Sequence, residues 1–267
     1  MQKTTPPWQH LLLLCVSLLW ANGATAFSAM VSPPRFELVA KPGQTLREVL
    51  EISHVDATPG SYSFATADWS MDANAVVTFT DALSTDSCRS WVAIERRKMT
   101  LPANGRAKFR IEISVPATAV ARECRFALLV QGDDQVAQSP NLPMPIAGRI
   151  GIIFYVAVAG AKPALTFAPQ GVARFENVNT PMLSVSNAGN AHGRLAGVLT
   201  GTDASGKRFE FVPEAVPILA GETRAVKLAP NLLGGAAGSP TLPIRVSGQL
   251  EWGDTRSAID HEFKATP

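Results

Sequence analysis

The sequence LPMPIAGRIGIIFYV, residues 142–156, carries the clearest strand pattern of the chain. In its first half, successive side chains alternate between two faces. Its second half is a nearly continuous apolar run, and Arg149 lies between the two halves. This pattern predicts one long β-strand with an embedded charge. Such a strand could capture another extended chain beside an anion-binding group, or it could be a core strand that leads into an interdomain linker.

Short strand patterns recur on both sides of this segment, with Pro and Gly between them and almost no helical periodicity. Before it, the expected strands are 36–39, 46–52, 62–67, 76–80, 91–94, 109–115 and 124–130. After it, they are 165–167, 182–186, 195–200, 209–212, 224–228, 244–250 and 259–263. Many short strands at this spacing indicate β-sandwiches.

Small residues and a proline interrupt the pattern around 158–163. We therefore expect an all-β chain of two β-sandwich domains joined by a short hinge, with domains at 27–158 and 163–267. Within the first domain, Phe109, Ile111, Ile113 and Val115 should face the core, because the residues between them are polar or charged.

The first residues have the pattern of a secretory signal peptide. Lys3 precedes the apolar run 11–20, and the small residues of Ala24-Thr-Ala26 follow it. We expect cleavage after residue 26, which leaves a mature chain that begins near Phe27. No later segment is long and apolar enough for a membrane-spanning helix, so no membrane span is expected in the mature chain.

Cys88 and Cys124 are the two cysteines outside this signal, since Cys15 lies within it. In an exported protein they predict one disulfide. Free core thiols or half of a metal site are the alternatives, but no histidine spacing supports a metal site.

The composition argues against several classes of function. Lys and Arg total 24 against 22 Asp and Glu, and the charges are interspersed, so nucleic acid is not an expected partner. The histidines of the mature chain, His54, His192 and His261, have no recognisable catalytic spacing, and the common nucleophile, phosphate and metal motifs are absent. We expect no enzyme activity, no cofactor and no metal.

Five segments together are similar to the PapD-like family, the periplasmic chaperones of fimbrial subunits. They are VSPPRFEL at 31–38, SCRSWV at 87–92, TLPANG at 100–105, RECRFALLV at 122–130 and NAGN at 187–190. The resemblance implies two immunoglobulin-like domains arranged as an L. It also implies a pilin-like subunit as partner and a periplasmic location, and it leaves open whether an outer-membrane usher is a further partner.

The resemblance implies that two basic residues bind the C-terminal carboxylate of the subunit, and it places them at Arg35 and Arg149. It assigns Leu142, Met144 and Ile146 as the apolar residues of the donated strand. With these three aligned, the second anchor of the family falls on Gly151, so Arg149 lies two residues early but on the same strand face.

Pro143 and Pro145 cannot donate hydrogen bonds to a neighbouring strand. Both remove donors from the same edge and leave intact the edge served by 142, 144 and 146, so strand addition would have to use that edge. Alternatively, the prolines protect an edge strand against aggregation.

The function implied is that of a chaperone that caps pilin-type subunits. The alternative is a structural or adhesive cell-envelope protein of tandem immunoglobulin-like modules, which would bind protein or carbohydrate through its loops. An accessory domain of a hydrolase or lyase is a third reading, which lacks a visible nucleophile–base pair.

Overall fold

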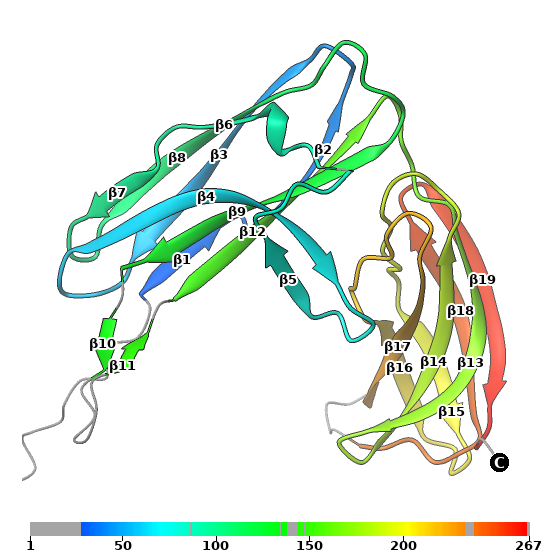
Figure 1. Cartoon of the computed structure of the whole chain (residues 1–267). Coiled ribbons are helices and arrows are strands. Elements are labelled where there is room, and N and C mark those ends of the chain that lie inside the picture. Colours follow the sequence, from blue (N-terminus) through cyan, green and yellow to red (C-terminus); the bar gives the residue numbers. More distant parts are fainter. Residues whose placement is uncertain are drawn as a thin grey trace, which may run out of the picture.

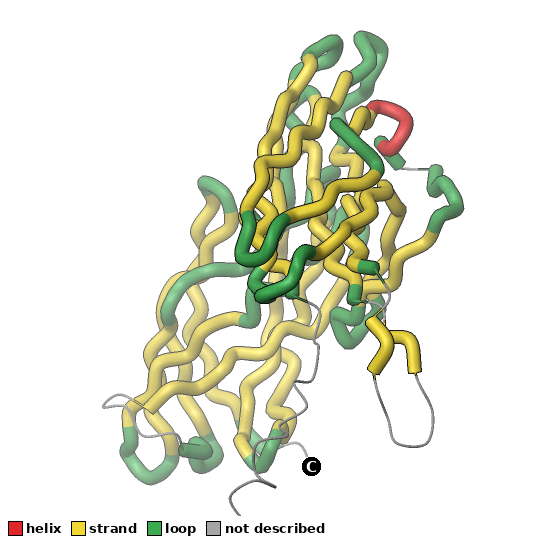
Figure 2. The backbone as a smooth tube through the Cα atoms, turned by 90° about the vertical axis from the view of Figure 1, so that its left-hand side faces the viewer, coloured by secondary structure: helices red, strands yellow, loops and turns green. Residues whose placement is uncertain are grey.

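The computed structural model describes residues 28–85, 87–133, 135–137, 144–146, 148–232 and 238–265. Almost all of its regular structure is β-strand, and helix in these ranges is limited to one 3-10 turn, η2 (Arg89–Trp91) (Figure 2). Over the same ranges, no helix has the length and apolar character needed to cross a membrane. The chain is all-β, as the sequence predicts.

Two sheets pack against each other in the first of two β-sandwich units (Figure 1). One has the order β1-β3-β8-β6: β1 (Ala29–Ser32), β3 (Thr45–His54), β8 (Arg106–Ser114) and β6 (Val92–Ile94). The other has the order β2-β12-β9-β4-β5, with β7 also on β4: β2 (Arg35–Ala40), β12 (Arg149–Val158), β9 (Glu123–Gly132), β4 (Gly60–Met71), β5 (Val77–Thr80) and β7 (Lys98–Leu101).

The chain changes sheets between β1 and β2, and this change positions the site. β2 runs parallel to β12, with Arg35 opposite Ile153 and Ala40 opposite Val158. On its other edge β12 pairs with β9 from Arg149 onward. The first four residues of β12 therefore have a strand on one edge only, within the part of the chain that the structure describes.

The core of the first unit contains stacked aromatic rings and a disulfide. The Phe154 ring lies between those of Phe36 and Phe126, stacked at 4.5 Å from each. The four residues of the 109–115 pattern are all buried, which confirms the predicted alternation. Cys88 and Cys124 form the predicted disulfide, with their Cα atoms 5.6 Å apart.

The second unit is a β-sandwich formed by one continuous, curved sheet of seven strands in the order β13-β14-β17-β16-β15-β18-β19. These strands are β13 (Leu165–Phe175), β14 (Val178–Asn187), β15 (Leu199–Asp203), β16 (Arg208–Pro213), β17 (Thr223–Leu232), β18 (Ile244–Trp252) and β19 (Thr255–Phe263). Contacts between β13 and β19 bring the two ends of the sheet near each other around a core that includes Phe209, Phe211 and Phe263. The strand predicted at 195–200 begins only at Leu199, since Gly197 has a positive φ of 120°.

Asp203 fixes a turn of the second unit. Its buried carboxylate accepts hydrogen bonds from the backbone N–H groups of Thr241, Ser205 and Lys207 and from the Ser205 hydroxyl. Burial raises the pKa of Asp203, but these hydrogen bonds outweigh burial and lower that pKa to about 2.

The 142–156 segment is not one strand, which corrects the sequence prediction. It contains β11 (Met144–Ile146) and β12, with Gly148 outside both. β11 pairs with β10 (Gln135–Ala137) in a separate two-stranded ribbon, while β12 belongs to the sheet. Periodicity along one segment does not show which neighbour each part pairs with, so this break was not visible in the sequence.

Candidate functional site

A cleft of about 450 Å³ lies where the two units meet. Its walls are mainly apolar and carry arginines from both sides. From the first unit come Pro34, Arg35, Trp69, Met71, Ala75, Val77, Ile153 and Tyr155, and from the second Arg194, Glu214, Ala215, Val216 and Pro217.

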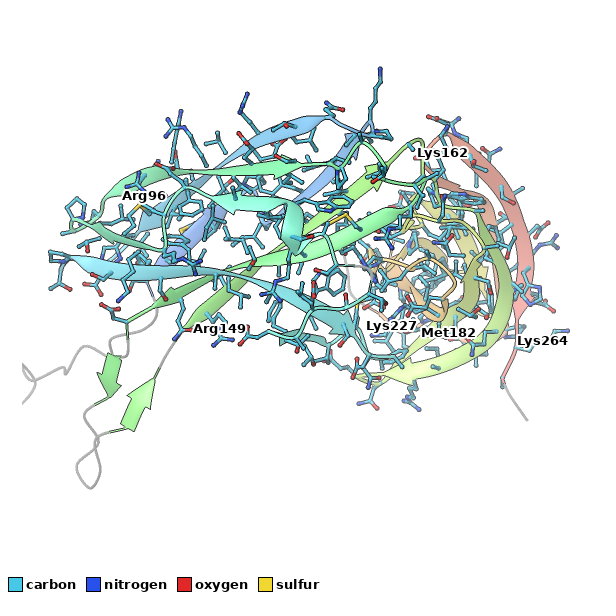
Figure 3. The ribbon with its side chains drawn as sticks, turned by 45° about the horizontal axis from the view of Figure 1, so that its top comes forward. Arg96, Arg149, Lys162, Met182, Lys227 and Lys264 are labelled. Atoms are coloured by element: carbon cyan, nitrogen blue, oxygen red, sulfur yellow. A yellow bond between two sulfur atoms is a disulfide. The ribbon has the colours of Figure 1, made fainter. Side chains whose placement is uncertain are left out.

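Arg35 lines this cleft and Arg149 does not. Arg35 pairs with Ile153 in the sheet, four residues after Arg149, so the two Cα positions differ by about 13 Å along the strand. The Arg149 guanidinium donates a hydrogen bond of 3.1 Å to Gln131, and it lies at the end of β12 remote from the second unit (Figure 3). The structure places both arginines on one sheet face but does not bring their guanidinium groups together.

Phe79 covers Gly151, the position on which the second anchor of the family would fall. A Cβ atom at Gly151 would lie 2.2 Å from the Cζ atom of the Phe79 ring. A long basic side chain could therefore not leave β12 at this position unless Phe79 moved. The aromatic ring from β5 occupies the space that such a side chain would need.

The residues predicted for the donated strand lie at or beyond the limit of what the structure describes. Leu142 is outside the described residues. Met144 and Ile146 belong to β11, opposite Ala137 and Gln135. Because Pro145 has no N–H group, hydrogen bonds from β11 to β10 must come from residues 144 and 146. β10 therefore occupies the edge that keeps its donors.

A second arginine of the cleft, Arg194, was missed by the sequence analysis. Its Nη1 atom donates to Glu37 Oε1, and that same oxygen accepts a hydrogen bond of 2.9 Å from Arg35 Nε. The Arg194 guanidinium also lies over the Tyr155 ring, 5.2 Å from its centroid. One carboxylate therefore bridges two arginines that come from different units.

Behind Arg194 lies a buried pair formed by His192 and Glu123. His192 Nδ1 is 2.6 Å from Glu123 Oε2, and His192 Nε2 is 2.8 Å from Arg194 Nη1. Because a guanidinium can only donate, Nε2 must accept and Nδ1 must carry the proton. A neutral imidazole thus orients Arg194, and His192 additionally stacks on Tyr155 with ring centroids 3.8 Å apart.

The electrostatics of the cleft favour an ionised Glu37. Burial raises the pKa of Glu37, but attraction to Arg194 and the hydrogen bond and charge of Arg35 outweigh burial and leave that pKa below its usual range. Burial raises the pKa of the neighbouring Tyr155 phenol. Tyr155 therefore remains protonated at neutral pH.

Arg224 makes a further link between the units. From β17 its Nη1 atom donates to the carbonyl oxygens of Asp72 (2.8 Å) and Ala73 (3.2 Å), in the turn between β4 and β5. Figure 1 shows this turn reaching from the first unit toward β16 and β17. The β4–β5 hairpin therefore bridges the units on one side of the cleft.

The other candidate groups have structural partners. His54 is buried between the Tyr62 hydroxyl (2.5 Å) and the Thr58 carbonyl oxygen (2.6 Å), which agrees with a satisfied structural histidine. Across the described ranges, no three His, Cys, Asp or Glu side chains gather as metal ligands would. The cleft itself has an apolar wall and two arginines, Arg35 and Arg194, and the Glu37 carboxylate that joins them lies in the adjoining cavity.

No protein-family model matches the sequence, and no curated protein matches it significantly. Many solved structures resemble its fold, and several of these are chaperones, among them a class 5 fimbriae chaperone. A chain of the complex of Salmonella enterica SafA pilin with the SafB chaperone is 13% identical, with 90% of this chain and 99% of that chain covered at a TM-score of 0.49. The E. coli chaperone DraB is 15% identical, with 91% and 99% covered at a TM-score of 0.45. A chain of the Acinetobacter baumannii CsuC-CsuE complex of a chaperone with a tip adhesion subunit is 13% identical, with 88% and 98% covered, also at 0.45.

Proposed function

We propose that the chain is a periplasmic chaperone that binds a pilin-type subunit lacking one strand of its own fold. The observation that carries the proposal is the position of Arg35. It lies in the interdomain cleft, at the point where the unpaired edge of β12 ends and β2 begins. An edge that ends at a basic group suits the C-terminus of an extended guest chain.

The register of β2 relates the direction of such a guest to the position of its C-terminus. β2 pairs with β12 from Ile153 onward and runs parallel to it. A guest strand beside residues 149–152 would lie on the same edge of β12 as β2, in line with β2 and before Arg35. If it also runs parallel to β12, its last residue reaches Arg35, and its carboxylate enters the cleft. The reverse direction would bring the middle of the guest chain to this arginine.

The chemistry of the cleft matches a C-terminal residue. The apolar wall formed by Trp69, Ile153 and Tyr155 can take an apolar side chain, while Arg35 offers forked donors to the carboxylate. Each charge-assisted hydrogen bond in such a site contributes about 1.5–3 kcal/mol. Arg149, farther along the same face, would contact the guest chain upstream of its end.

The proposal also assigns the donated residues 142, 144 and 146 to pockets of the guest. Backbone pairing supplies affinity without sequence selectivity, and alternate side chains fix the register. Since β10 occupies the edge of β11 that keeps its donors, β11 would have to leave β10 before it could pair with a subunit.

The disulfide is consistent with export of the protein. Cys88–Cys124 is a feature of oxidising compartments such as the periplasm. In this proposal residues 1–26 are removed as a signal peptide, and N-terminal sequencing of the mature protein should begin at Phe27.

Capture from the native periplasm tests the function. The tagged full chain should co-purify with a pilin-type subunit that mass spectrometry identifies. Arg35→Ala should lower the yield of this subunit at least about tenfold, the loss expected for one charge-assisted contact. Arg47→Ala is the matched control, because Arg47 forms a surface ion pair with Glu112 in the same unit.

Equal subunit recovery with Arg35→Ala and Arg47→Ala would show that the cleft arginine is not an anchor. Recovery of no pilin-type protein, together with binding of glycans or matrix proteins through the loops, would instead support the adhesive alternative.

A further inference from the structure

The Glu37 carboxylate, in the cavity that adjoins the cleft, accepts hydrogen bonds from the two arginines that a guest carboxylate in the cleft would use. Its Oε1 atom receives Arg35 Nε at 2.9 Å and Arg194 Nη1, and it lies 3.8 Å from His192 Nε2. Two guanidinium groups that converge on one carboxylate oxygen form an anion site. In the unliganded chain, this site is filled by a side chain of the protein itself.

We propose that Glu37 is an internal stand-in for the guest carboxylate, and that the guest displaces it and is then held by Arg35 and Arg194 together. This inference rests on the proposed function and adds to it a binding residue from the second unit. Guest binding would thereby connect both units through one carboxylate.

The exposure of the three side chains supports displacement of Glu37. The Glu37 side chain is 46% exposed on an outermost strand of its sheet, so it can turn into solvent. The Arg194 side chain is only 15% exposed and is held by Tyr155 and His192, so it stays in place when Glu37 leaves. The Arg35 side chain is 53% exposed and can move as Glu37 can. Arg194 is therefore the fixed part of the site, and the Glu37 carboxylate is the exchangeable part.

Two buried donors of the cleft lack an acceptor within the described part of the chain. They are Nε of Arg194 and Nε1 of Trp69, and both residues line the cleft. A buried N–H without a partner is costly, so an acceptor that reached either atom would gain a hydrogen bond that the free chain lacks. A guest terminus carries both carboxylate and peptide oxygens.

The position of Glu37 relative to the cleft explains how exchange can occur. Arg35, Tyr155 and Arg194 line both the cleft and an adjoining cavity of about 460 Å³, whereas Glu37 lines only the adjoining cavity. A guest that enters through the cleft therefore reaches the two arginines from a cavity that Glu37 does not line. Two carboxylates at one pair of arginines would repel each other, so entry of one favours release of the other.

The experiment uses the mature protein with ¹⁵N-labelled arginine and tryptophan. The probe is a synthetic N-acetylated Ala-Val-Tyr tripeptide with a free carboxylate, and the same peptide as a C-terminal amide is its control. The free acid should shift the Arg35 and Arg194 Nε–H signals and the Trp69 indole signal, and the amide should shift none of them.

Variants separate displacement from simple binding. Glu37→Gln should bind the free acid about tenfold more tightly, because a competing charge-assisted contact is removed. Arg194→Ala and Arg194→Lys should each weaken binding by about tenfold or more, because the forked donor is lost. Glu112→Gln, which removes a carboxylate paired with Arg47 on β3, should leave the affinity unchanged.

Unchanged affinity in Glu37→Gln overturns the inference, and so does full affinity in both Arg194 variants. The gain in Glu37→Gln cannot arise from misfolding, so an unstable Arg194 variant does not obscure the result. Suppose that Arg35→Ala abolishes subunit capture, but the Glu37 and Arg194 variants bind the peptide with wild-type affinity. This inference then fails and the chaperone function stands. If neither subunit nor free-acid peptide binds the wild type, both fail.

Discussion

Arg224→Ala should detach the β4–β5 hairpin from the second unit and lower the free energy of unfolding by about 3 kcal/mol. The Arg224 side chain is 3% exposed, and it donates to Asp72 and Ala73 across the interface and to Glu222 in its own unit. Loss of one partner from a buried ionic network costs about 3–5 kcal/mol. The estimate lies at the lower end because the exposed carbonyl groups of the turn can bind water instead.

Urea unfolding followed by tryptophan fluorescence measures this loss, and hydrogen exchange of the turn amides locates it. Arg245→Ala is the matched control. Arg245 makes two hydrogen bonds to Asp260 in the same unit, but its side chain is 69% exposed, so its removal should cost at most about 1 kcal/mol. If both variants unfold within about 0.5 kcal/mol of each other, the hairpin does not stabilise the interface through Arg224.

Three further changes test the fold. Gly151→Ala should lower the free energy of unfolding in urea by about 1–3 kcal/mol, because its methyl group would clash with the Phe79 ring. Adding Phe79→Ala should recover part of this loss. If the losses of the two single variants simply add in the double variant, the two residues are not in contact. Replacing Cys88 and Cys124 by Ser should lower the free energy of unfolding by about 4 kcal/mol, because the disulfide links residues separated by 36 positions and so restricts the unfolded chain. Equal stability of the oxidised wild type and this variant would contradict the estimate. Because the pKa of Asp203 is lowered to about 2 in the folded state, its stabilising effect is complete above pH 4 and disappears as the pH falls through 2. Between pH 4 and pH 2 the wild type should therefore lose more stability than Asp203→Asn in acid–urea titrations, and parallel curves would show that this carboxylate is not stabilised.

Most strands of the fold could be predicted because their side-chain alternation is local. In β8, Phe109, Ile111 and Ile113 are buried as expected, since a strand with one polar face has only one way to fit a sandwich. The break between β11 and β12 could not be predicted in the same way. It depends on which strand each part pairs with, and residues distant in sequence provide those partners.

The candidate site was only partly visible in the sequence. Arg35 was found through the resemblance of its segment to a family motif, and the structure places it in the cleft. Arg194 lies 157 residues after Glu37, and only folding brings the two side chains together. The predicted convergence of Arg35 and Arg149 is not seen, because Arg35 pairs with Ile153 rather than with a residue near 149. No spacing rule in a single sequence encodes such a register.

Hydrogen exchange of β12 in the presence and absence of the captured subunit tests the central claim most directly. Amides of Arg149–Ile152 that point away from β9 have no strand beside them in the described structure of the free chain. The account predicts that these amides become strongly protected when the subunit binds, and that Arg35→Ala reduces this protection together with subunit affinity. A bound subunit that leaves their exchange rates unchanged would show that the guest chain lies elsewhere on the protein.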